Sequence, residues 1–453
     1  MADFDVKVGF SRVVITPPLG TNIHGYFHQR IAEGVLDDLE VNAVAVSKDG
    51  NTVVLFAIDC EASTTEYCEL VRNEVSKATG LPKHAIYMHS THTHVGPCLG
   101  YARTEQGFCN DLDTEYYSYT VKNIVSACVY AIQDLKPAKM GIAVSKAERV
   151  GFNRRYLMKD GSTKTNPGVN NPDIVRSIGL LDERVNVIRF MRECGDNIVI
   201  GNYGNHPDVI GNNLISADWL GFARRTFERA IENTKCVFFN GAQGDINHVN
   251  VKPVGGDLNG MFNDFDDVTR GYAHSRHIGN VLAGAMMSVY EKVEFIPVSE
   301  VKSTEVISSV ASNMPKPEDM EKAYYIQKMV DEGRRDELPE KGMLLTTVIA
   351  EAARMIRLEH GPESFPMNLN AIKIGDVAFI GIPGEPFTGV GMGLKEAKGY
   401  KMVCPTCLTN GSRGYFPMQD SYDEGGYEAR SSNFKAGVAE TIIAEGKKIL
   451  ENL

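Results

Sequence analysis

The chain has 453 residues, 43% of them hydrophobic and 23% charged, a length and balance typical of one large or two ordinary globular domains. Its 47 Lys and Arg residues against 58 Asp and Glu residues give a formal net charge of −11, which argues against nucleic acid as a partner because phosphate binding needs clustered cations. No apolar run is long enough to span a bilayer, and the N-terminus lacks the basic and apolar regions of a secretory signal.

Nine cysteines are scattered along the chain, and because the number is odd, at least one has no partner within it. This usage is typical of a reducing compartment, so we expect a cytoplasmic protein with no stable membrane insertion. Cys404 and Cys407 form a CxxC motif that could serve a redox reaction or half of a zinc knuckle. Because no second CxxC exists, we favour structural thiols.

Segments with strand and helix character alternate along the chain. Residues 52–58 form a continuous apolar run rich in branched side chains, as in a buried strand. Ser63-Thr64-Thr65-Glu66 then indicates the start of a helix that runs to Gly80. The same criteria predict strands at 85–88, 197–203, 236–239 and 373–382, and helices at 115–135, 218–232 and 272–290. This order predicts an α/β fold, with a mixed β-sheet core and flanking helices.

No Gly/Ser-rich linker divides the chain, so we expect a single domain over residues 1–453. Residues 313–363 differ from their surroundings because they are strongly charged, favour helix and contain several methionines. This segment is either a helical excursion on the surface or a flexible wall or lid over a pocket, since methionine adapts to varied shapes.

Four of the predicted strands are followed by polar loops that contain glycine. Their chemistry-bearing segments are His92-Thr93-His94, Asn205-His206-Pro207, Gly241–Asp245 and Pro383-Gly384-Glu385. Ligands of open α/β sheets bind beyond the carboxyl ends of the strands, so these loops predict one shared site.

Histidine and carboxylate side chains in these loops are suitable ligands for zinc. On extended backbone His92 and His94 point to the same side, which makes a metal corner. A catalytic zinc keeps one position open for water and lowers the pKa of that water to about 7. Taken singly, each histidine is more often an ordinary polar residue, so the conjunction of the loops carries the prediction.

With these segments in place, the sequence resembles the catalytic domain of the neutral (alkaline, non-lysosomal) ceramidase family. The matching segments occur in the family's order between residues 8 and 432: His92–Pro97, Asn153-Arg154, His206-Pro207, Gly244-Asp245, Ile382–Glu385, and the tyrosine-rich stretch Tyr415…Tyr422…Tyr427-Glu428-Ala429. The resemblance implies a zinc-dependent amidohydrolase. It implies four metal ligands, with Tyr422 as the alternative to the last of them: His92, His206, Glu385 and Tyr415. It also implies three groups that face the substrate: His94, Arg154 and Tyr427.

Three departures from the family pattern bear on the substrate. Where the family continues Gly-Asp-Val-Ser, this chain has Gly244-Asp245-Ile246-Asn247. Asn247 cannot act as a nucleophile, but it can donate a hydrogen bond to an oxyanion. Members of the family also carry a C-terminal immunoglobulin-like domain and an export signal, and we expect neither in this chain. We therefore expect a small soluble or lipid-like substrate whose non-peptide amide bond is cleaved by metal-activated water.

Each predicted side chain has a role in this mechanism. Tyr427 or Asn247 stabilises the oxyanion, and His94 passes a proton to the leaving group. Arg154 either clamps a substrate carboxylate or hydroxyl or forms a structural ion pair. Asp245 is expected to orient a ligand histidine, with Asp218 and His248 in reserve.

Other functions remain open on the same residues. An esterase or lactonase could use the same zinc site, and a non-catalytic metal- or ligand-binding protein could use the same scaffold. Metal-dependent phosphoester hydrolysis is the least favoured, because the site is poor in paired aspartates. A small-molecule substrate is the expected partner, and a homo-oligomer is compatible with the sequence.

Overall fold

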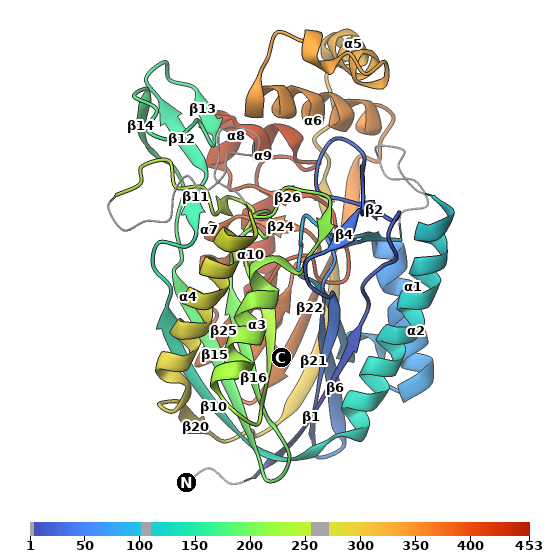
Figure 1. Cartoon of the computed structure of the whole chain (residues 1–453), viewed down its shortest axis with the longest axis vertical. Coiled ribbons are helices and arrows are strands. Elements are labelled where there is room, and N and C mark those ends of the chain that lie inside the picture. Colours follow the sequence, from blue (N-terminus) through green and yellow to red (C-terminus); the bar gives the residue numbers. More distant parts are fainter. Residues whose placement is uncertain (1–3, 101–109, 255–270) are drawn as a thin grey trace.

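The computed structural model describes residues 4–100, 110–254 and 271–453, and two β-sheets form its core (Figure 1). The order of the larger sheet is β18 (Thr234–Asn240), β16 (Asn197–Tyr203), β15 (Arg184–Arg192), β10 (Lys136–Lys146), β1 (Val6–Val14), β5 (Glu40–Lys48), β6 (Asn51–Ile58), β8 (Ile86–Ser90), and β20 (Glu294–Ile296) pairs with β10. The order of the smaller sheet is β21 (Val301–Ala311), β22 (Ser364–Ile374), β23 (Val377–Gly381), β25 (Met402–Thr406). The predicted mixed sheet with flanking helices is confirmed, but the second sheet was not foreseen.

The two sheets pack face to face, because one buried apolar cluster takes side chains from both. Val44 and Leu55 of the larger sheet meet Ile372 and Phe379 of the smaller sheet in this cluster. Helices cover the outer faces: α1 (Thr65–Thr79), α2 (Asp111–Gln133), α3 (Asp218–Ala230) and α4 (Tyr272–Tyr290) on the larger sheet, and α7 (Thr388–Leu394) and α10 (Val438–Glu451) on the smaller. Burial of apolar side chains between these four layers drives the assembly.

One order of elements occurs three times along the described chain. Three strands are followed by a helix, a fourth strand and a second helix. The three units are β1-β5-β6-α1-β8-α2, β10-β15-β16-α3-β18-α4 and β21-β22-β23-α7-β25-α10. In each unit the last two strands are parallel, namely β6 with β8, β16 with β18, and β23 with β25. Parallel strands end at the same edge of a sheet, so each unit presents two loops on the same side.

Local sequence signals account for several of the observed elements. Thr64 caps α1 by accepting a hydrogen bond from the Tyr67 amide at 3.1 Å, and Gly80 ends that helix in the left-handed conformation. The predicted elements at 197–203 and 272–290 match β16 and α4. The single strand predicted at 373–382 is wrong, because Gly375 turns the chain between the end of β22 and β23.

Residues 313–363 contain α5 (Met320–Asp331) and α6 (Gly342–Leu358), which lie above the strand ends in Figure 1. These helices share a small apolar cluster that includes Met329, Leu338 and Ile349, with Phe27 packed against it. The segment therefore has its own core, and α6 also contacts α9 (Tyr427–Ser431). None of the helices in the described ranges is long and apolar enough to cross a membrane.

Candidate active site

Backbone hydrogen bonds join the loops of all three units at one edge of the sheets. The His94 amide donates to the Pro207 carbonyl at 3.0 Å, which links the first unit to the second. The Asn410 amide donates to the Met88 carbonyl at 2.9 Å, which links the third unit to the first. The prediction that separate strand ends meet at one place is therefore seen in the fold.

His92 and His206 both present Nε2 to the space between the loops. Nδ1 of His92 lies 2.8 Å from the Glu61 carbonyl, and Nδ1 of His206 lies 2.8 Å from the Gln243 carbonyl. Because a carbonyl only accepts, both Nδ1 atoms carry a proton, and in the neutral form of each ring Nε2 keeps a lone pair. This is the tautomer that a metal-ligating histidine needs.

The backbone of His92 is unusual. Its φ of 76° lies in the left-handed region, which residues other than glycine seldom adopt. Its amide donates to the Cys60 carbonyl at 2.9 Å, which helps to hold this conformation. Strain of this kind is typical of positions where a side chain must point in a required direction.

Glu385 and Tyr415 come together through strand register. β24 (Glu385–Pro386) pairs with β26 (Tyr415–Phe416) in parallel, and Glu385 and Tyr415 are direct partners. Oε2 of Glu385 lies 3.3 Å from Nε2 of His92 and 3.1 Å from Nε2 of His206. The ring of Tyr415 lies beside that of His206, with centroids 6.4 Å apart. The four side chains for which the resemblance implied metal ligation thus form one cluster.

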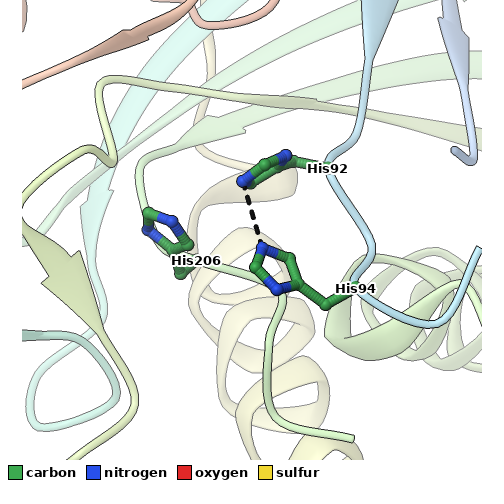
Figure 2. A group of neighbouring side chains, drawn as sticks. All are labelled: His92, His94 and His206. Atoms are coloured by element: carbon green, nitrogen blue, oxygen red, sulfur yellow. Dashed lines mark hydrogen bonds between the residues drawn. The ribbon is translucent and has the colours of Figure 1, made fainter. Parts of the chain in front are cut away.

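His94 belongs to the same cluster. Figure 2 shows its ring facing those of His92 and His206, and its Nε2 lies 3.2 Å from Nε2 of His92. The three histidines offer nitrogen atoms that all lie within 4.8 Å of one another. A Cβ at Gly25 would lie 2.6 Å from Cγ of His94, so this ring packs directly against backbone. Geometry alone therefore does not separate a substrate-facing His94 from a ligating one.

Arg154 and Tyr427 surround Tyr415. Arg154 donates from Nη2 to the Tyr415 hydroxyl at 3.1 Å and from Nε to Oε1 of Glu428 at 2.6 Å. The Tyr427 ring meets the Tyr415 ring edge-on at 5.6 Å. Arg154 thus forms the structural ion pair that was one of its two predicted roles, and the same guanidinium holds the Tyr415 hydroxyl.

Burial and neighbouring charges shift the pKa values of the cluster in opposite directions. Burial alone would lower the pKa of His92, but the carboxylates of Glu385 and Glu61 raise it to about 9. Burial lowers the pKa of His94, and the neighbouring His92 lowers it further. Burial would raise the pKa of Glu385, but the neighbouring His92 and His206 hold it well below its usual range. The cluster therefore contains an ionised carboxylate against imidazole nitrogens.

The remaining predicted residues lie around the cluster rather than in it. Asn247 accepts the Val249 amide at 3.0 Å and donates to Oδ1 of Asn166 at 3.4 Å, so both polar atoms of its side chain have partners outside the imidazole cluster. The Tyr422 hydroxyl donates to the Phe434 carbonyl at 2.7 Å. Both side chains serve to hold loops together.

The carboxylates of Asp245 and Asp218 accept hydrogen bonds from backbone amides, and His248 contacts the carboxylate of Asp208. Asp245 accepts the Thr388 amide at 2.7 Å, and Asp218 accepts the Val209 amide at 3.0 Å in the loop after His206. His248 lies 3.0 Å from Asp208. Asp218 therefore positions the loop that carries a candidate ligand, whereas Asp245 positions the start of α7.

Two carboxylates at the site were not foreseen. Glu61 follows β6 in the first unit, and its Oε1 is 3.8 Å from Nδ1 of His92. Glu428, which is fully buried, neutralises Arg154. The position of Glu61 just after the strand at 52–58 was the signal available for the first. Glu428 was visible only as part of the motif that begins at Tyr427.

These residues fit a divalent cation. Nε2 of His206 is buried against the Glu385 carboxylate at 3.1 Å, and no donor among the described residues reaches it. The lone pairs of two imidazoles and one carboxylate oxygen converge within about hydrogen-bond distance, an arrangement that repels unless a cation or a proton lies between them. Neutral imidazole, carboxylate and a phenol are donors that zinc accepts.

In this layered α/β fold, the donors at the strand ends form a candidate metal centre. The family description "neutral/alkaline non-lysosomal ceramidase, N-terminal" matches residues 6–262, which is more than half of the chain. The chain therefore belongs to the neutral/alkaline non-lysosomal ceramidase family, and the resemblance stated from its motifs is confirmed.

Two solved structures share the fold. The neutral ceramidase from Pseudomonas aeruginosa matches with a TM-score of 0.74 and 17% identity, over 99% of this chain and 74% of that chain. A ceramidase complexed with C2 matches with a TM-score of 0.73 and 17% identity, over 100% of this chain and 76% of that chain. At this identity the likeness concerns the fold alone. No curated protein matches the chain.

Proposed function

We propose that this protein is a zinc-dependent amidohydrolase that cleaves the non-peptide amide bond of a small or lipid-like N-acyl substrate. The observation that carries the proposal is the convergence of His92 and His206 Nε2 on the Glu385 carboxylate, at 3.3 and 3.1 Å, with Tyr415 as its strand partner. Membership of a ceramidase family supports the amide bond as the target. Zinc would be held by these four residues.

A bound zinc ion supplies Lewis-acid polarisation of the substrate carbonyl and a water of lowered pKa. The protein side chains supply the remaining functions. The Tyr427 hydroxyl is the hydrogen-bond donor proposed for the developing oxyanion, since burial raises its pKa and keeps it protonated. His94, whose pKa is lowered, stays neutral at pH 7 and can accept a proton and return it to the leaving nitrogen. Arg154 holds the Tyr415 hydroxyl in position.

The test compares amides with other acyl compounds under control of the metal. The purified chain is analysed for metals, stripped with a chelator and reloaded with Zn²⁺, Mn²⁺ or Co²⁺. It is then assayed on amides, esters and lactones that share one acyl chain. We expect amide hydrolysis that disappears on chelation and returns with Zn²⁺. Hydrolysis that survives complete metal removal would contradict zinc dependence, and turnover of esters or lactones without amides would reassign the bond.

Zinc uptake should release about one proton per site near pH 7.5, because His92 is protonated in the metal-free protein and must be neutral to bind. With its pKa raised to about 9, protonated His92 stabilises the metal-free fold fully below its ordinary pKa, and this stabilisation is lost as the pH rises through 9. Zinc affinity should therefore fall about tenfold per pH unit between pH 9 and 7. Calorimetric titrations in buffers of different ionisation enthalpy count the protons. An affinity independent of pH over this range would contradict the prediction.

A further inference from the structure

The cavity at the metal cluster has two lobes that meet at His94, Tyr415 and Tyr427, which line both. The first lobe has a volume of about 410 Å³ and extends from Glu385 to Arg357 and Arg413. The second lobe has a volume of about 340 Å³ and extends under α6. A substrate that fills both lobes therefore has its central bond beside the proposed metal ligands.

The two lobes differ in chemistry. The second is walled by Met343, Leu345 and Ile349 of α6. Its buried charged groups are paired, Arg154 with Glu428 and Asp208 with His248, and its half-buried Arg335 lies 3.9 Å from Asp336. It suits an acyl chain, since apolar surface of the chain is then removed from water. The first lobe instead contains an arginine that forms no ion pair with any of the described carboxylates.

This arginine is Arg413. In the described part of the chain, Arg413 forms no ion pair with any carboxylate, and its guanidinium lies 5.6 Å from the centre of the Phe365 ring, which lines the same lobe. Asn433 links the two arginines, because it donates to the Arg413 carbonyl at 3.1 Å and accepts from Nη2 of Arg357 at 2.5 Å. The two carboxylates of the lobe, Glu61 and Glu385, both face His92.

We propose that the amine side of the substrate carries an oxyanion, either a carboxylate or a phosphate, that binds to Arg413 with Arg357 beside it. The substrate class is then an N-acyl amine with an anionic head, such as an N-acyl amino acid, rather than a neutral N-acyl alcohol. The planar guanidinium matches the two oxygens of such a group, and Arg413 is half-buried at the wall of the lobe while Arg357 is exposed at its rim. This inference rests on the proposed amide hydrolysis at the same site.

The test uses the zinc-loaded full chain and compounds that share one acyl chain. N-Acylglycine and an N-acyl phosphoethanolamine are compared with the neutral N-acylglycinamide, by kcat/KM and by the dissociation constant from calorimetry. We expect at least about a tenfold preference for one of the anions, expressed mainly in KM. The carboxylate and phosphate arms decide which oxyanion is bound.

Arg413→Gln should abolish the preference for the anionic over the neutral compound, giving a ratio of about one. Arg413→Lys should retain part of the preference, because lysine keeps the positive charge but lacks the paired donors of the guanidinium. The matched control is Arg176→Gln, which removes the same charge from an exposed position on β14 (Ile174–Ser177). The control should keep the full preference.

Two results would overturn the inference. One is equal use of neutral and anionic compounds, and the other is an anion preference that survives in Arg413→Gln, since the metal itself would then be binding the oxyanion. The binding measurement keeps the two proposals apart. If no amide is cleaved but anionic compounds still bind more tightly through Arg413, the proposed hydrolysis fails and the anion site stands.

Discussion

Replacement of Glu385 by glutamine is expected to remove the bound metal and to reduce turnover at least about a thousandfold, equivalent to about 4 kcal/mol of transition-state stabilisation. The carboxylate lies against Nε2 of both His92 and His206 and is the one buried negative charge in contact with both. Glutamine keeps the shape but loses the charge, so any effect reports electrostatics rather than packing. Metal content by elemental analysis and kcat on the best amide are measured together.

The comparison variant is His94→Gln, which decides the role that the geometry leaves open. If His94 carries a proton, this variant keeps stoichiometric metal and loses most turnover. If His94 is a ligand, metal is lost from both variants. Full metal and full turnover in Glu385→Gln would contradict the proposed centre, whatever His94 does.

Replacement of Arg224 by methionine is expected to destabilise the fold by about 3–5 kcal/mol. Arg224 on α3 donates to Asp59 at the end of β6, with Nη2–Oδ2 and Nη1–Oδ1 distances of 2.5 and 3.1 Å, and contacts Glu40 at 3.3 Å. The two partners are 1% and 0% exposed, so the variant leaves a buried carboxylate without its counter-charge. Burial already raises the pKa of Asp59 in spite of Arg224, which indicates how costly this charge becomes when alone.

Chemical denaturation followed by circular dichroism measures the effect, with Arg229→Met as the control on an exposed turn of the same helix. The control should change stability by less than about 0.5 kcal/mol. The double variant Asp59→Leu with Arg224→Met should recover much of the loss, because a buried ion pair can often be replaced by apolar contact. A single Arg224→Met variant as stable as the control would contradict the assignment.

The sequence allowed the strand-end loops and most of the donor cluster to be predicted. His92 and His206 follow continuous apolar strands, and such strands are easily recognised because they are buried on both faces. The meeting of these loops at one edge of the sheets could also be predicted, because sites in α/β folds generally lie beyond the carboxyl ends of the strands. The specific pairing of Glu385 with Tyr415 did not follow, because strand register between two-residue strands depends on tertiary contacts.

The strands, the sheet division and the buried carboxylate that the sequence did not reveal all lack a local sequence signal. β10 combines buried with half-buried and exposed positions, and in the largely buried β15 the apolar run is interrupted by Asn186 and Arg189. Both strands therefore lack the continuous apolar run that marked the strand at 52–58. The second sheet could not be separated from the first, because the patterns of β22 and β23 say nothing about which neighbour they pair with. Glu428 was recognisable only within a motif, since its value lies in neutralising Arg154, 274 positions away in the chain.

The three consecutive units of the fold each supply part of the proposed ligand set: His92 from the first, His206 from the second, and Glu385 with Tyr415 from the third. An incompletely synthesised polypeptide that has made only the first two units holds the three imidazoles of His92, His94 and His206 but lacks Glu385 and Tyr415. The proposed set of four ligands is therefore complete only when the third unit docks. We therefore expect a nascent chain to lack the proposed hydrolytic centre until its third unit has been synthesised.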